Sequence, residues 1–179
     1  MAIQQIVVLI INIIGGIAVI GSYIYGFNAQ SGGANVLWGG VPSSVRMVIS
    51  ISLIIATFAY LAFLYFILFQ LTPSEVKIAG QFNYSLFYVI FIGILLPSAF
   101  WMPLTNLYAT NMSTGVWIAI RAVLILVGLS AIALAWALLS LQTREPAVAY
   151  WAAVAGSVYF AFHAGVLDAI IWAAFFRST

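Results

Sequence analysis

The sequence predicts an all-α membrane protein in which a single domain forms a bundle of five transmembrane helices. Of the 179 residues, 66% are hydrophobic and only 4% are charged, whereas a soluble globular domain has about 25% charged residues. Apolar stretches of about 20 residues or more, enough for a helix to cross the hydrocarbon core of a bilayer, occur five times. The alternating apolar and polar residues of membrane-barrel strands are absent from the sequence. We therefore expect lipid to be the solvent for most of the chain.

Each predicted helix is a long apolar run bounded by polar residues, glycines or prolines. The five helices are expected near residues 5–27, 45–71, 84–104, 115–141 and 147–176. Glycines and prolines punctuate the first connecting segment, residues 28–44, and polar residues fill the segments 72–83 and 106–114. The segment 142–146, QTREP, predicts a tight turn, and Pro146 suits the start of the last helix. The N-terminal run lacks the positively charged start of a signal peptide, so we expect it to remain as the first helix.

The odd number of spans places the two termini on opposite sides of the membrane. Arg46 and Arg177 fall on one side, with Arg121 just inside it. Lys77 and Arg144 fall on the other side, each near a glutamate. The positive-inside rule counts cations and largely ignores acids. On a margin of one residue, we expect the N-terminus outside and the C-terminus in the cytoplasm.

The residues available for chemistry are few. The absence of cysteine excludes disulfides, thiolate nucleophiles and iron–sulfur ligation. One histidine, His163, and three acidic residues form no convincing catalytic triad or zinc set, and the sequence does not identify a metal. The single lysine, Lys77, lies in a predicted connection, so a retinal Schiff base is excluded. Five scattered cations form no nucleic-acid-binding surface. An enzyme is therefore not the expected class.

Asp168 and Arg121 are the two charged residues well inside predicted helices. A charged side chain at mid-helix costs about 2.5–3.5 kcal/mol on insertion scales, so it usually faces the bundle and has a partner. With the turn centred between Arg144 and Glu145, Asp168 and Arg121 lie at equal depth on the two arms of a helical hairpin. The sequence therefore predicts that they form an ion pair.

Stripes of small residues favour a close contact between the fourth and fifth helices. The stripe on the fifth helix comprises Ala153, Ser157, Ala161, Ala164 and Asp168, and the stripe on the fourth comprises Arg121, Gly128, Ala131 and Ala135. His163 precedes Asp168 by five residues, about 140° around an α-helix, so the two are not expected to share a face. Two readings of the buried charges stay open: a structural ion pair, or the polar lining of a ligand cavity or proton relay.

Pro97 and Pro103 bracket Trp101 in the third helix. Each proline releases a backbone carbonyl, which predicts a kinked helix that faces protein or a cavity. The same comparison of depth places Trp101 of the third helix at about the level of Arg121 on the fourth helix and Asp168 on the fifth. The candidate ligand-binding residues are therefore Ser98, Trp101, Arg121 and Asp168, with Trp38 and His163 as further candidates. The alternative is a kinked helix braced by an ion pair. For His163, a neutral hydrogen-bonded side chain and axial ligation of a haem or chlorophyll are both open.

Three short features carry a resemblance to the TspO/MBR family of tryptophan-rich sensory and translocator proteins. They are Trp101-Met102-Pro103 in the third helix, Trp38 in the first connection and Leu167-Asp168 in the fifth helix. The sequence departs from the family in having LWGGVPSS in place of a Trp-x-Pro-Pro loop motif, and its second helix lacks proline and tryptophan. The resemblance implies a five-helix bundle that binds porphyrins, sterols or similar lipophiles in a pocket open to the long first connection.

The function expected from the sequence is to bind or pass a lipophilic small molecule such as a tetrapyrrole, carotenoid or sterol. In this hypothesis Arg121 anchors the ligand, Asp168 holds the arginine, Trp101 stacks on the ligand and residues 28–44 form a lid. The alternative is an accessory subunit of a larger respiratory or photosynthetic complex, whose aromatic residues, 16% of the chain, contact lipids, pigments or neighbouring membrane subunits. A homo-oligomer is also compatible with the sequence. An ion-coupled transporter that runs on Arg121, Asp168 and His163 is the third possibility.

Overall fold

The computed structural model describes residues 1–29 and 33–177, and its five long apolar helices confirm the all-α bundle. The helices are α1 (Ile3–Asn28), α2 (Ser43–Tyr65), α3 (Leu86–Thr110), α4 (Thr114–Leu139) and α5 (Ala147–Phe162). The π-helical turn η2 (Phe66–Gln70) extends α2, and the π-helical segment η3 (His163–Trp172) and α6 (Ala173–Phe176) extend α5. The resulting spans of 25 to 30 residues can cross a bilayer, so the chain is an integral membrane protein in contact with lipid.

The predicted end of the third helix, near residue 104, was wrong, because α3 continues to Thr110. The polar residues of its last turns bond to their own helix. Thr105 Oγ1 donates to the carbonyl of Trp101 at 2.9 Å, and Asn106 Nδ2 donates to the carbonyl of Met102 at 3.1 Å. Side chains that bond back to the preceding turn need no water, so their polarity does not end the helix.

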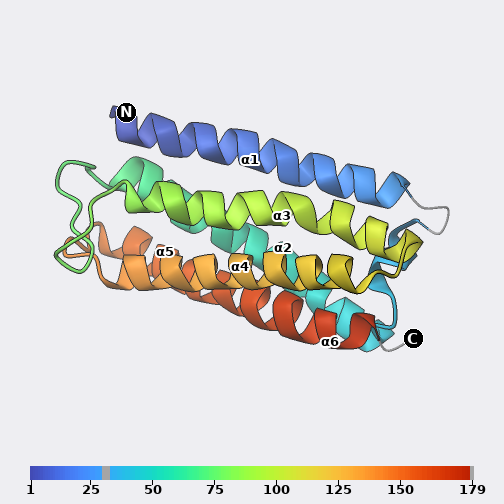
Figure 1. Ribbon diagram of the computed structural model, residues 1–179. Helices are drawn as coiled ribbons and strands as arrows, with labels where there is room; N and C mark the ends of the chain where they lie inside the picture. Colours follow the sequence, from blue (N-terminus) through green and yellow to red (C-terminus); the bar gives the residue numbers. More distant parts are fainter. Residues whose placement is uncertain (30–32, 178–179) are drawn as a thin grey trace.

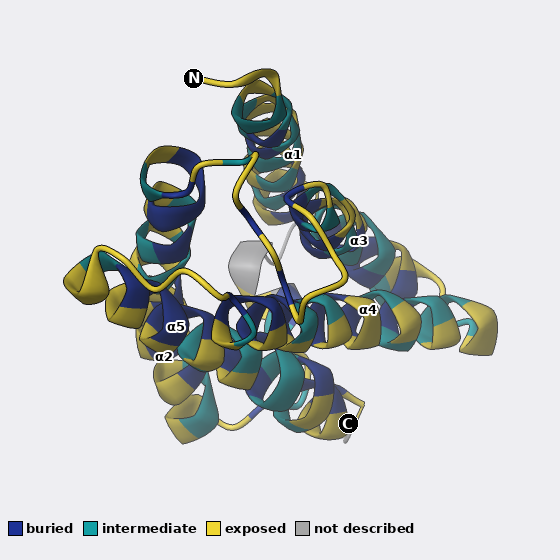
Figure 2. Cartoon of the chain, turned by 90° about the vertical axis from the view of Figure 1, so that its left-hand side faces the viewer, coloured by how far each residue is buried: buried dark blue, intermediate teal, exposed yellow. Residues whose placement is uncertain are grey.

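A glycine lies at each of the four closely packed helix pairs in the described part of the chain. The contacts are Gly15 against Leu95 (α1 and α3), Gly93 against Ser130 (α3 and α4), Gly128 against Gly165 (α4 and η3) and Gly156 against Ala59 (α5 and α2). Small residues let helix backbones approach closely in lipid, where van der Waals packing drives helix association. The packing order is therefore α1, α3, α4, α5 and α2 (Figures 1 and 2).

The predicted contact between the fourth and fifth helices is confirmed, with one addition. Gly128 packs so closely that a Cβ placed on it would lie 3.0 Å from the Cα of Gly165. Ala131 of α4 and Ala153 of α5 are fully buried, as the two stripes predict. Gly165 does not belong to the predicted stripe, because η3 winds more loosely than an α-helix in this region.

Helices α1 and α2 are held together at one end. Gln5 Nε2, on α1, donates to the carbonyls of Leu68 and Leu71 at 2.8 and 3.2 Å, next to the end of α2. The Tyr60 hydroxyl of α2 donates to Asn12 Oδ1 of α1. Further along the bundle α1 packs on α3 and α2 packs on α5, so the side of the bundle between α1 and α2 is the loosely packed one.

The first connection is more ordered than a simple loop, since it contains the 3₁₀-helix η1 (Gly33–Trp38). It packs on the end of the last span, where Gly40 N–H donates to the Phe176 carbonyl at 3.2 Å. Gly39 has a φ of +49°, and a Cβ there would lie 2.5 Å from the same carbonyl oxygen, so this position requires glycine. Residues 30–32 of the predicted lid lie outside the described residues. The chain termini lie at opposite ends of the bundle (Figure 1).

Candidate functional site

Two adjoining cavities occupy the centre of the bundle. The central cavity has a volume of about 300 Å³ and is lined by residues of α1, α2, α3, α4, α5 and η3. The loop-side cavity has a volume of about 280 Å³ and lies beneath η1. Both volumes are close to the lower end of the range for small-molecule sites, about 300–1,000 Å³. The walls that the cavities share are formed by Tyr23, Leu53, Trp101, His163 and Asp168.

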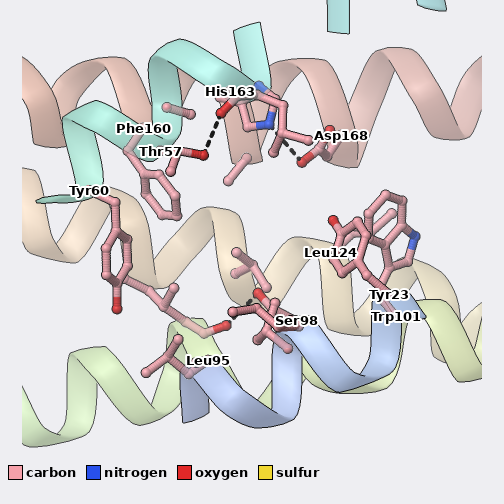
Figure 3. A pocket seen from close by; sticks show the side chains of 18 of the residues that line it. Tyr23, Thr57, Tyr60, Leu95, Ser98, Trp101, Leu124, Phe160, His163 and Asp168 are labelled. Atoms are coloured by element: carbon pink, nitrogen blue, oxygen red, sulfur yellow. Dashed lines mark hydrogen bonds and ion pairs between the residues drawn. The ribbon is translucent and has the colours of Figure 1, made fainter. Parts of the chain in front are cut away.

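Most of the central cavity is apolar, and the Asp168 carboxylate lies at one end of it. Tyr23, Trp101 and Asp168 lie together at that end, whereas Tyr60 and Phe160 lie at the other (Figure 3). Ser98 also lines the central cavity, but its Oγ donates to the Ile94 carbonyl at 2.6 Å. At the other end the Thr57 hydroxyl donates to the Leu53 carbonyl and the Tyr60 hydroxyl donates to Asn12 Oδ1, so these polar groups are already bonded within the protein.

His163 and Asp168 share a face, contrary to the sequence prediction. The imidazole Nε2 lies 3.5 Å from the Asp168 Oδ2, and both residues line the two cavities. The prediction assumed an α-helix, but residues His163–Trp172 form a π-helix. Hydrogen bonds from residue i to residue i+5 bring residues five apart onto one face. The helical winding therefore creates this pair.

A hydrogen-bonded chain fixes the histidine. His163 Nδ1 lies 3.0 Å from the Ser52 Oγ of α2, and that oxygen lies 2.9 Å from the Tyr159 hydroxyl of α5. Ser52 and His163 are buried, with 4% and 3% of their surfaces exposed. With Ser52 at one ring nitrogen and Asp168 at the other, His163 has no free nitrogen for axial ligation of a haem or chlorophyll. The hydrogen-bonded alternative for His163 is the one that the structure supports.

The predicted ion pair between Arg121 and Asp168 was wrong. The depth argument placed them at nearly the right level, because Arg121 Nη1 donates to the carbonyl of Ala169, the residue after Asp168, at 2.7 Å. The Asp168 carboxylate instead lies next to the His163 imidazole, with Oδ2 and Nε2 3.5 Å apart. Arg121 is also not among the described residues that line either cavity. The π-helical winding turns the carboxylate away from the arginine and toward the cavity.

Trp101 forms a wall between the two cavities. Its ring contacts Tyr23 edge-on with centroids 5.9 Å apart, and contacts Trp172 with centroids 5.2 Å apart. Its indole Nε1 is buried without a hydrogen-bond partner among the described residues. Trp38 lines the loop-side cavity, as does Leu37, whose carbonyl accepts a hydrogen bond from Trp172 Nε1 at 3.3 Å. The described part of the predicted lid therefore covers the loop-side cavity.

The sequence analysis missed the contribution of the first two helices to the cavity. From α1, the structure brings Gly16, Val19 and Tyr23 to the central cavity. Together with the buried Asn12, these residues follow steps of four, three and four, so they form one stripe along the helix. In the sequence, that stripe was the feature that could have indicated a cavity-facing side of α1. From α2, the cavity-lining residues are Leu53, Ala56, Thr57, Tyr60 and Leu61.

The described residues contain no group of three histidine, cysteine, aspartate or glutamate side chains that could hold a metal ion. The residues that line the two cavities offer a ligand apolar contacts, aromatic rings and the Asp168 carboxylate. Comparison with protein-family models, with curated proteins and with solved structures returns no significant match.

Proposed function

We propose that this protein binds or passes a lipophilic small molecule within the bilayer. The observation that carries the proposal is the pair of adjoining cavities, about 300 and 280 Å³, inside the helix bundle. Concave, largely apolar cavities with a few convergent polar groups are the usual form of small-molecule sites. In this proposal Arg121 does not anchor the ligand, because it is not among the described residues that line either cavity.

The ligand enters from the lipid, between α1 and α2. Three residues that line the central cavity are also exposed on the outer surface: Ile20 on α1 is 63% exposed, and Leu53 and Leu61 on α2 are 43% and 54% exposed. The side of the bundle between these two helices is loosely packed. Among the described residues, no glycine there lets the two helix backbones approach closely. A lipophile dissolved in the bilayer then reaches the cavity without passing through water.

The resemblance to the TspO/MBR family supports the same proposal. Its motif residues Trp38, Trp101 and Asp168 come from three different parts of the chain, and all of them line the loop-side cavity. Sterols and porphyrins are therefore the first lipophiles to test. A porphyrin would have to bind without a cationic side chain for its carboxylates, because the cavity-lining residues of the described chain include no lysine or arginine.

A matched pair of glycine substitutions on α1 tests the proposal. Gly16 lines the central cavity and Gly21 does not, yet a Cβ at either position would meet no atom within 4 Å. Gly16→Leu should place a side chain in the cavity, and Gly21→Leu should add the same side chain outside it. The probe is dehydroergosterol in lipid nanodiscs, measured by energy transfer from tryptophan. We expect saturable transfer for the wild type and Gly21→Leu and its loss for Gly16→Leu. Equal transfer in all three proteins would reject the proposal.

The alternative proposal is an accessory subunit of a larger respiratory or photosynthetic complex. It is supported by the small mass outside the spans and by exposed aromatic residues such as Phe58 and Trp151, at 69% and 56%. Native electrophoresis of gently solubilised membranes, with an absorption spectrum of the band, separates the two proposals. A large or pigmented assembly favours the subunit, a small colourless species favours the lipophile binder, and a small multiple of the chain mass indicates a homo-oligomer.

A further inference from the structure

Asp168 lies at the boundary between the two cavities. It is one of the five residues that line both, and 17% of its side chain is accessible, compared with 4% for His163. Figure 3 shows the Tyr23 hydroxyl and the Asp168 carboxylate on the same side of the cavity. The structure contains no hydrogen bond between them, and the Asp168 carboxylate has no hydrogen-bond donor among the described residues except the contact with His163 at 3.5 Å. The carboxylate therefore has free acceptor positions that face the cavity.

The lysine and the arginines of the chain do not pair with this carboxylate. Arg121 is bonded to the Ala169 carbonyl, and Arg46 is bonded to the carbonyls of Val41 and Gly39. The others lie away from the cavity: Arg177 against the Trp117 ring, Arg144 against the Tyr150 ring, and Lys77 in the connection between α2 and α3. A carboxylate in an apolar site is costly unless it is paired and hydrogen-bonded. A molecule in the cavity that carries a positive charge would supply the missing partner.

We infer that the cavity selects its ligand by head-group charge and binds a lipophilic amine, whose ammonium group contacts Asp168. The inference rests on the proposed function and specifies its ligand class. The ammonium donates to the free carboxylate oxygens, and the Tyr23 hydroxyl accepts a further hydrogen bond. The adjacent rings of Tyr23 and Trp101, with centroids 5.9 Å apart, add cation–π attraction. The apolar body of the ligand lies against the aliphatic and aromatic walls toward Phe160. Lipophilic acids are repelled by the same carboxylate.

Three probes with one rigid apolar body test this inference. They are 1-adamantylamine, 1-adamantanol and 1-adamantanecarboxylic acid, titrated at pH 7 into the protein in phosphatidylcholine nanodiscs and followed by tryptophan fluorescence. Charge-assisted hydrogen bonds are about twice as strong as neutral ones. We expect the amine to bind the wild type at least about tenfold more tightly than the alcohol. The acid should bind more weakly than both.

Substitutions at Asp168 assign the selectivity to one side chain. Asp168→Asn should reduce amine affinity to the level of the alcohol and leave alcohol affinity within about twofold, while Asp168→Glu should keep the preference for the amine. Glu75→Gln, which removes an exposed carboxylate outside the cavity, should change nothing. If Asp168→Asn does not fold, the order of the three probes on the wild type still decides the question.

The outcomes separate this inference from the proposed function. Equal binding of amine and alcohol, or an amine preference that persists in Asp168→Asn, overturns the charge selectivity while lipophile binding stands. Failure of all three probes to bind also overturns it, and the sterol experiment with Gly16→Leu then decides separately whether the cavity binds lipophiles at all.

Discussion

The imidazole Nε2 of His163 lies 3.5 Å from the Asp168 carboxylate, although five residues separate the two along one helix. The contact exists because η3 is wound as a π-helix from His163 to Trp172. π-Helical turns are rare and occur frequently at functional sites. Here the winding turns one acidic side chain from the neighbouring helix α4 toward the cavity. A local change of helical geometry thus decides whether Asp168 is a structural partner of Arg121 or a group that a ligand can reach.

Energetic coupling should follow the contacts of Asp168. In double-mutant cycles measured by unfolding in mixed micelles, His163→Gln and Asp168→Asn should be coupled by about 0.5–3 kcal/mol, the range for residues in contact. The effects of Arg121→Gln and Asp168→Asn on the free energy of unfolding should be closer to additive. Arg121 bonds to the backbone carbonyl of Ala169, and Asp168→Asn does not remove that carbonyl. Stronger coupling of Asp168 to Arg121 than to His163 would contradict the geometry of η3.

Loss of the Ser52 hydroxyl should destabilise the protein. This oxygen joins His163 Nδ1 and the Tyr159 hydroxyl, at 3.0 and 2.9 Å. Ser52→Ala leaves both groups unpaired, and an unsatisfied buried polar group costs about 1–3 kcal/mol. Ser50→Ala, at an exposed position on the same helix, is the control and should have little effect. Thermal unfolding in detergent measures the difference, and equal melting temperatures for the two variants would show that the chain does not stabilise the fold.

At the contact between α4 and η3, an added methyl group should lower the stability of the protein when it is placed on α4 but not when it is placed on η3. A Cβ at Gly128 would lie 3.0 Å from the Gly165 Cα, whereas a Cβ at Gly165 would meet the Gly128 Cα at 3.9 Å, an ordinary contact. Gly128→Ala should therefore lower the free energy of unfolding by about 1–3 kcal/mol, as overpacking does. Gly165→Ala should be tolerated. The order of the two melting temperatures is the readout, and a reversed order would refute this packing.

The termini should be accessible from opposite sides of the membrane. We propose that the N-terminus is outside and the C-terminus is cytoplasmic, from the balance of cations in the connecting segments. The chain has no cysteine, so single cysteines at Ala2 and Arg177 provide unique labels. A membrane-impermeant maleimide added to intact cells should label Ala2→Cys and not Arg177→Cys. Labelling of only Arg177→Cys would reverse the orientation, and labelling of both would contradict the odd number of spans.

The sequence alone predicted the helices well, for a physical reason. In lipid each backbone polar group must be satisfied within the protein, so a long apolar run has little choice except a helix. The predicted span near 115–141 corresponds to Thr114–Leu139, and the predicted start at residue 147 corresponds to Ala147. The error at the end of α3 arose because Thr105 and Asn106 bond within their own helix, which composition does not reveal.

The candidate site was predicted only in part. Ser98, Trp101 and Asp168 do line one cavity, because they lie at equal depth on two helices that both pack on α4. The partner of Asp168 was wrong, because depth specifies the height of a side chain but not its direction around the helix. The direction depends on the winding of η3, and each residue from His163 onward has a different azimuth in a π-helix from the one it has in an α-helix.

The sequence by itself therefore determined the number and membrane-spanning character of the helices, since the bilayer imposes those properties through local hydrophobicity and backbone hydrogen bonding. Only the tertiary structure decided which helices are neighbours, where the bundle leaves a cavity and which way Asp168 faces. These features depend on contacts between residues far apart in the chain, such as Ser52 with His163 and Gly128 with Gly165, and on the energy of packing many side chains at once.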